Sequence, residues 1–81
     1  MKVSVRLFAV ARQLGGAESI ELDLPDGATV ADLRRLLALA TPELAAALPK
    51  MLIAVDSEYA GSTTVISPRA EIACIPPVSG G

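Results

Sequence analysis

The 81-residue sequence contains no histidine and only one cysteine, Cys74. The absence of histidine excludes Ser-His and Cys-His nucleophiles and leaves no side chain whose ordinary pKa lies near neutrality. A single cysteine cannot form an internal disulfide, and the usual cysteine and histidine ligands of a zinc site are missing. We therefore expect a chain that binds no metal or cofactor and that catalyses nothing by itself.

Aromatic side chains, net positive charge and long apolar runs are also scarce. Aromatic residues make up 2% of the chain, so aliphatic side chains must fill the core that a hydrophobic content of 52% allows. The formal net charge of −2 argues against a nucleic-acid partner, because phosphates require a basic face. The longest apolar runs, such as 36–40 and 51–55, are far shorter than the roughly 20 residues that span a bilayer. We expect one cytoplasmic domain with no membrane contact.

Three segments alternate between apolar and polar residues, which is typical of strands with one buried face. Residues 2–8 place their valines and Leu7 on one face and leave Phe8 on the other, polar face. Residues 18–24 and 71–75 alternate in the same way. The sequence therefore predicts a first strand over residues 2–8, a second over residues 18–24 and a last strand over residues 71–75.

The segment between the predicted helices and the last strand is less regular. Residues 51–55 form a short apolar run, which indicates a strand buried on both faces. Residues 57–62 are expected to form a loop that carries Tyr59, and residues 63–66 a further brief strand.

Apolar residues recur at helical spacing over residues 30–40. Thr29 is placed to act as the N-cap, and Asp32, three residues later, as the second member of a capping box. Pro42 ends this helix because proline disfavours helical geometry in the residue before it. Short helical segments are expected over 9–14 and 43–48.

The predicted fold is α+β, a ubiquitin-like β-grasp in which a mixed sheet of about five strands packs on one main helix plus a short helix. Residues 1–77 would form this domain, and residues 78–81 a flexible tail. Pro76 and Pro77 stop the last strand and hold the exit extended. Val78 can anchor in a partner, while Gly80 and Gly81 can enter a channel too narrow for side chains.

A terminal glycine leaves its carboxylate unshielded, which suits attack on the α-phosphate of ATP to give an acyl adenylate. With this tail, the sequence resembles the small sulfur-carrier subunits of molybdopterin synthase, in the MoaD and ThiS superfamily. The most specific motifs are Phe8-Ala9-x-x-Arg12 and Pro76-Pro77-Val78-x-Gly80-Gly81. Matching stretches cover nearly the whole chain, over residues 7–15, 29–34, 52–56 and 71–81.

The resemblance implies the chemistry and the partners. An adenylyltransferase similar to the ubiquitin-activating class would use ATP to adenylate Gly81, and a sulfur donor protein would convert the adenylate to a thiocarboxylate. The tail, with Val78, Ser79 and Gly80, would insert into the large synthase subunit. The sulfur would then pass to cyclic pyranopterin monophosphate, so that the chain donates sulfur and the large subunit supplies the catalytic groups.

Phe8 and Ile75 fall on the polar faces of their strands, and in a β-grasp sheet these two strands are neighbours. We expect the two side chains to form one exposed apolar patch, which usually marks an interface. The resemblance implies that Tyr59 also contacts the partner. Cys74 alternates inward and is expected to be a core residue.

Other functions remain compatible with the sequence. The chain could carry sulfur for thiamine or another product, or act as a ubiquitin-like modifier joined to lysines through Gly81. It could also be a plain interaction module whose tail is inert.

Overall fold

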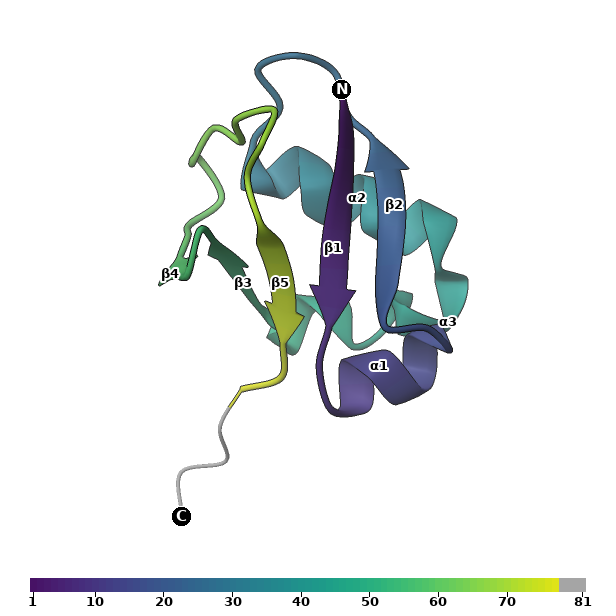
Figure 1. Cartoon of the computed structure of the whole chain (residues 1–81). Helices are drawn as coiled ribbons and strands as arrows, with labels where there is room; N and C mark the ends of the chain where they lie inside the picture. The colour runs from purple at the N-terminus through teal and green to yellow at the C-terminus, as the bar shows by residue number, and fades with distance from the viewer. Residues whose placement is uncertain (78–81) are drawn as a thin grey trace.

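A computed structural model describes residues 1–77, which form one five-stranded sheet with its helices on one side (Figure 1). The strand order is β2-β1-β5-β3-β4, and the sheet is mixed because β1 and β5 run parallel while the other pairs are antiparallel. The predicted β-grasp architecture is therefore confirmed. The strands are β1 (Lys2–Leu7), β2 (Ser19–Asp23), β3 (Leu52–Val55), β4 (Glu58–Tyr59) and β5 (Ile72–Ile75).

The main helix, α2 (Val30–Ala40), lies behind the sheet in Figure 1. It begins with the capping box that the sequence predicts: Asp32 donates its backbone N–H to the Thr29 hydroxyl, and the Asp32 carboxylate accepts from the Thr29 backbone N–H at 3.0 Å. Val30, Leu33 and Leu37 are fully buried beneath the sheet. Burying each such side chain contributes about 1.5–3 kcal/mol to the stability of the two packed layers.

Three short helices complete the layer: α1 (Val10–Gly15), α3 (Pro42–Ala45) and the 3-10 helix η1 (Leu48–Lys50). Pro42 is the first residue of α3, where the fixed φ of proline matches helical geometry. Arg34 on α2 binds η1 and the residue before β3, because its guanidinium donates at 2.8 Å to the carbonyl oxygens of Leu48 and Met51. This contact fixes the point where β3 begins.

The structure corrects the sequence-based expectations between residues 43 and 66. The expected helix over 43–48 is only α3, and Pro49 lies inside η1. The expected loop over 57–62 contains β4, whereas the expected strand over 63–66 is reduced to an isolated bridge between Thr29 and Val65. Within residues 1–77, no helix combines the length and the apolar content that crossing a membrane would require.

Candidate functional site

The parallel pairing of β1 with β5 places the first and the last strand of the domain side by side. Leu7 lies opposite Cys74, and the next residue, Phe8, donates its backbone N–H to the Cys74 carbonyl oxygen at 3.2 Å. Because side chains alternate between faces, Leu7 and Cys74 point into the core while Phe8 and Ile75 point away from the helices. The predicted neighbourhood of Phe8 and Ile75 is thus present.

Strands β3 and β4 extend this apolar surface. Leu52 lies opposite Ile75, Ala54 lies opposite Ala73, and Tyr59 on β4 lies opposite Ala54. Paired residues share a face, so these side chains lie on the side of the sheet that the helices leave open. We call this surface the outer patch, and it consists of Phe8, Leu52, Ala54, Tyr59, Ala73 and Ile75.

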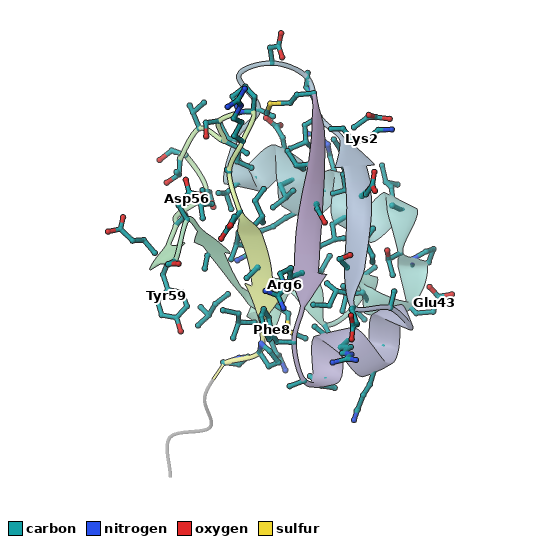
Figure 2. The ribbon with its side chains drawn as sticks, in the orientation of Figure 1. Lys2, Arg6, Phe8, Glu43, Asp56 and Tyr59 are labelled. Carbon is teal, nitrogen blue, oxygen red and sulfur yellow. The ribbon has the colours of Figure 1, made fainter. Side chains whose placement is uncertain are left out.

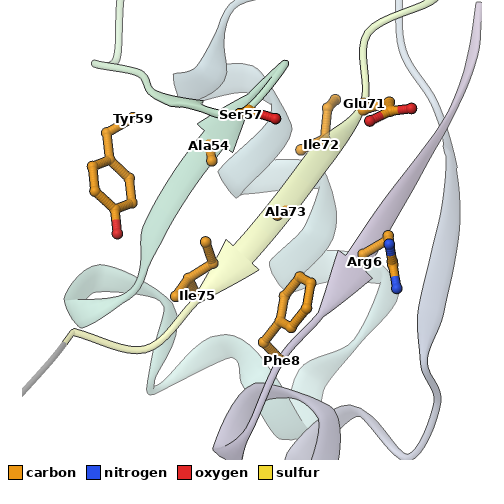
Figure 3. A pocket seen from close by; sticks show the side chains of 9 residues that line it. All are labelled: Arg6, Phe8, Ala54, Ser57, Tyr59, Glu71, Ile72, Ala73 and Ile75. Atoms are coloured by element: carbon orange, nitrogen blue, oxygen red, sulfur yellow. The ribbon is translucent and has the colours of Figure 1, made fainter.

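The outer patch is hollowed rather than flat. A shallow depression of about 370 Å³ is lined by the patch residues other than Leu52, together with Arg6, Ser57, Glu71 and Ile72 (Figure 3). Phe8 is 40% and Tyr59 67% exposed, while Ile75 is half-buried. Figure 2 labels Phe8 and Tyr59 among the side chains of the domain. An exposed, concave apolar surface of this kind suits the insertion of a partner's apolar side chain.

Sequence reasoning identified Phe8, Ile75 and Tyr59, but it missed Leu52, Ala54 and Ala73. Leu52 was expected to be buried on a doubly covered strand, yet it is 36% exposed because the helices cover only one face of β3. Only the strand register places Leu52 and Ala54 on the same face as Ile75, whereas Ala73 shares that face through the alternation of β5 itself. The predicted fold class places its helices on only one side of the sheet. This alone would have indicated that the other face of the sheet is open.

Turns with positive φ flank the outer patch at both ends. Ala9 follows Phe8 with φ 51° and ψ −125°, in a turn closed by a bond from the Ala11 N–H to the Phe8 carbonyl oxygen at 3.0 Å. Asp56 and Ser57 have φ values of 51° and 71° and connect β3 to β4 as a two-residue hairpin turn. Glycine adopts these conformations most readily, and none of the three residues is glycine. The backbone is therefore strained in both turns that hold the patch residues.

Cys74 lies directly behind the outer patch but has no access to it. Its side chain is 0% exposed, as the sequence predicts. Burial raises the pKa of the Cys74 thiol, and the nearby Arg34 charge opposes this only in part. The thiol is therefore neutral and enclosed, which is the opposite of a reactive cysteine. No group of acidic or cysteine side chains among residues 1–77 could hold a metal ion.

The C-terminal end of β5, where the chain leaves the sheet, adjoins the outer patch. Strand β5 ends at Ile75, at the same end of the sheet as the end of β1, and is followed by Pro76 and Pro77 (Figure 1). Any segment that continues from Pro77 thus starts beside Phe8 and Ile75. The predicted tail residues Val78, Ser79, Gly80 and Gly81 lie outside the described residues.

Comparison with known protein families and sequences gives consistent matches over the full length. The family described as the ThiS family matches residues 5–81. The molybdopterin synthase sulfur carrier subunit of Arabidopsis thaliana is 35% identical, over 100% of this chain and 84% of that protein. The subunit of the same name from Dictyostelium discoideum is 40% identical, over 95% of this chain and 93% of that protein.

Solved structures share the fold closely. SAMP1, the small archaeal modifier protein 1, from Haloferax volcanii superposes with a TM-score of 0.90 at 26% identity, covering 100% of both chains. A candidate molybdopterin converting factor subunit 1 from Pyrococcus furiosus superposes with a TM-score of 0.84 at 27% identity, over 96% of this chain and 99% of that one.

Proposed function

Because the chain belongs to the ThiS family, we propose that it is the sulfur carrier of a molybdopterin synthase. The observation that carries the proposal is the sequence Pro76-Pro77-Val78-Ser79-Gly80-Gly81, whose first two residues follow β5 beside the outer patch. The two relatives described above, which carry the name of that subunit, support it. A carrier needs a docking surface and a reactive end, and this arrangement joins the two.

The proposed chemistry takes place at the Gly81 carboxylate and uses no side chain of this protein. A carboxylate oxygen of Gly81 attacks the α-phosphate of ATP and releases pyrophosphate, which leaves an acyl adenylate. A donor that supplies sulfur at the oxidation level of sulfide then displaces AMP and leaves a thiocarboxylate. This sulfur is transferred to cyclic pyranopterin monophosphate in the large synthase subunit.

The side chains of the chain fit a donor role better than a catalytic one. No histidine is present, and the one thiol is buried and neutral. We propose that the outer patch docks on the large subunit while Gly80 and Gly81 occupy a narrow channel there. The proline pair limits the number of conformations that the segment loses on entering such a channel.

Intact-mass measurement tests the proposal directly. The protein is incubated with ATP, the activating adenylyltransferase and a sulfur donor, and we expect the mass to rise by the replacement of one oxygen by sulfur. A variant that lacks Gly81, and a reaction without ATP, are the controls and should show no such gain. If the variant that lacks Gly81 still gains sulfur and forms molybdopterin with the large subunit, Gly81 is not the site of sulfur transfer.

A second function is favoured by the structural likeness to SAMP1, whose name describes a protein modifier. In that case a lysine amine, rather than a sulfur nucleophile, would displace AMP from the Gly81 adenylate and form an amide. Proteins of increased mass that carry this chain on lysine, and that disappear when Gly81 is deleted, would indicate this use. The two functions share the first activation step and can coexist.

A further inference from the structure

Arg6 is a charged residue on the rim of the outer patch, and the residues directly opposite it on the two neighbouring strands carry no charge. It lies opposite Ser19 on β2 and opposite Ala73 on β5. Lys2, at the other end of the same strand, instead lies opposite Asp23. Within residues 1–77 the salt bridges are Arg12–Glu18 and Arg35–Asp32, so Arg6 forms none there.

The Arg6 side chain lies over an aromatic ring of the patch. Its guanidinium carbon lies 5.4 Å from the centroid of the Phe8 ring, within the range of a cation–π contact. A planar guanidinium can use its face for a ring and its N–H edge for an oxygen pair at the same time. Arg6 is thus positioned on the hollow before any partner arrives (Figure 3).

Glu71 lines the same hollow, but the geometry does not make it the counter-ion of Arg6. No Arg6–Glu71 contact lies within salt-bridge distance. The Glu71 backbone is held elsewhere, since its N–H donates to the Asp56 carboxylate at 2.9 Å. The hollow therefore has an exposed cation and an exposed anion on its rim that form no salt bridge with each other.

We infer that Arg6 sets the specificity of the outer patch by binding a carboxylate that the partner presents next to the apolar side chain it inserts. This inference rests on the proposed function, in which the large synthase subunit covers the patch. Covering Phe8 also removes water from the guanidinium stacked on it, and a desolvated charge without a counter-ion strongly disfavours binding. A carboxylate satisfies this requirement best, because it accepts two parallel N–H bonds from the guanidinium edge.

The test is calorimetric titration of the large subunit with full-length variants. Arg6→Gln should weaken binding by about tenfold or more and reduce the dependence of Kd on salt concentration. Arg6→Lys should recover only part of the loss, because lysine keeps the charge but not the planar donor pair. Arg69→Gln, which changes an exposed arginine that does not line the hollow, is the matched control and should bind as wild type does.

The Glu71→Gln variant distinguishes a contact of Arg6 with the partner from a contact of Arg6 with Glu71. If Arg6 binds a partner carboxylate, removing the competing charge of Glu71 leaves the affinity unchanged or higher. Equal weakening by Arg6→Gln and Glu71→Gln would instead mean that the two residues act on each other, and the inference would be wrong. It would also be wrong if Arg6→Gln bound within twofold of wild type.

The failure of this inference can be told apart from failure of the proposed function. If Phe8→Lys abolishes binding while Arg6→Gln does not, the docking surface stands and only the role of Arg6 is lost. If the wild-type protein does not bind the large subunit at all, both are overturned.

Discussion

Phe8 and Cys74 are joined by a backbone hydrogen bond of 3.2 Å, yet their side chains lie on opposite faces of the sheet. This one contact fixes the pairing at the ends of β1 and β5. The alternation of side chains along each strand directs the sulfur of Cys74 into the core and the ring of Phe8 toward the hollow. The surface that meets a partner is thereby kept separate from the protein's only thiol.

Lysine in place of Phe8 should weaken binding to the large subunit while the domain stays folded. Phe8 is exposed until the complex forms, whereas a lysine there would place a charge in a dry interface, at a cost of several kcal/mol. Ile75→Lys should act in the same direction, with some loss of stability because Ile75 is half-buried. Calorimetry gives the affinities, and thermal unfolding reports on the fold.

Leu39→Lys is the matched control for these substitutions. Leu39 is 72% exposed on α2, and α2 covers the opposite face of the sheet. We expect its affinity to equal that of wild type. Unchanged affinity of Phe8→Lys would rule out the outer patch as the docking surface, and global unfolding of that variant would contradict the outward orientation of Phe8.

Replacing Cys74 with alanine should leave sulfur transfer intact and lower the free energy of unfolding by about 1 kcal/mol, because a small cavity remains. Cys74→Ser should be more harmful, since a buried hydroxyl without a partner costs about 1–3 kcal/mol. Denaturant unfolding and the thiocarboxylate mass assay measure the two effects. A Cys74→Ala protein with wild-type stability and no sulfur transfer would assign the thiol a role in the chemistry.

Alternation and spacing were sufficient to predict the strands β1, β2 and β5, the main helix and its capping box. These elements are long or strongly patterned. Strand β4 could not be predicted, because it has two residues and its turn, Asp56-Ser57, contains none of the glycine that usually marks positive φ. The capping pair Thr29 and Asp32 needed no tertiary information, since both lie within one turn of chain.

The candidate site was predictable only in part, for a different reason. Phe8 and Ile75 are visible as apolar residues on polar faces, so the sequence alone points to them. Leu52 was placed in a doubly buried strand because a short apolar run does not reveal which face a helix will cover. Arg6 belongs to the polar face of β1, and its contact with Phe8 depends on side-chain geometry that no sequence pattern encodes.

Substituting glycine for Ala9 should raise the free energy of unfolding by about 1 kcal/mol. Alanine at φ 51° and ψ −125° is strained, and glycine adopts this conformation without a clash. Ala31→Gly, at an exposed position within α2, is the control and should lower stability by about 1 kcal/mol. Urea unfolding decides the matter: if both variants are destabilised alike, Ala9 is not strained.

Asp32 should make the stability of the domain depend on acid pH. The pKa of its carboxyl is lowered below 3.8 by the Thr29 backbone N–H first and the Thr29 hydroxyl next, with Arg35 adding to this and burial opposing it. A depressed pKa in the folded state contributes stability above pH 3.8, and this is lost as the pH falls through the folded value. The difference in unfolding free energy between wild type and Asp32→Ala should therefore be largest at neutral pH and shrink below pH 3.8. A difference that stays constant with pH would contradict a charged capping box.

The position of the last carboxylate should matter more than the identity of the last side chain. Deleting Gly81 or adding one residue displaces the carboxylate by up to roughly 3.5 Å along an extended chain. Acyl transfer requires reacting atoms within about 3–3.5 Å, so either change should abolish thiocarboxylate formation. Gly81→Ala keeps the carboxylate in register and should still be adenylated, but its methyl group should obstruct a glycine-wide channel in the large subunit. Pyrophosphate release measures adenylation, and molybdopterin formation measures transfer; equal loss of both in Gly81→Ala would mean that the restriction lies in the activating enzyme instead.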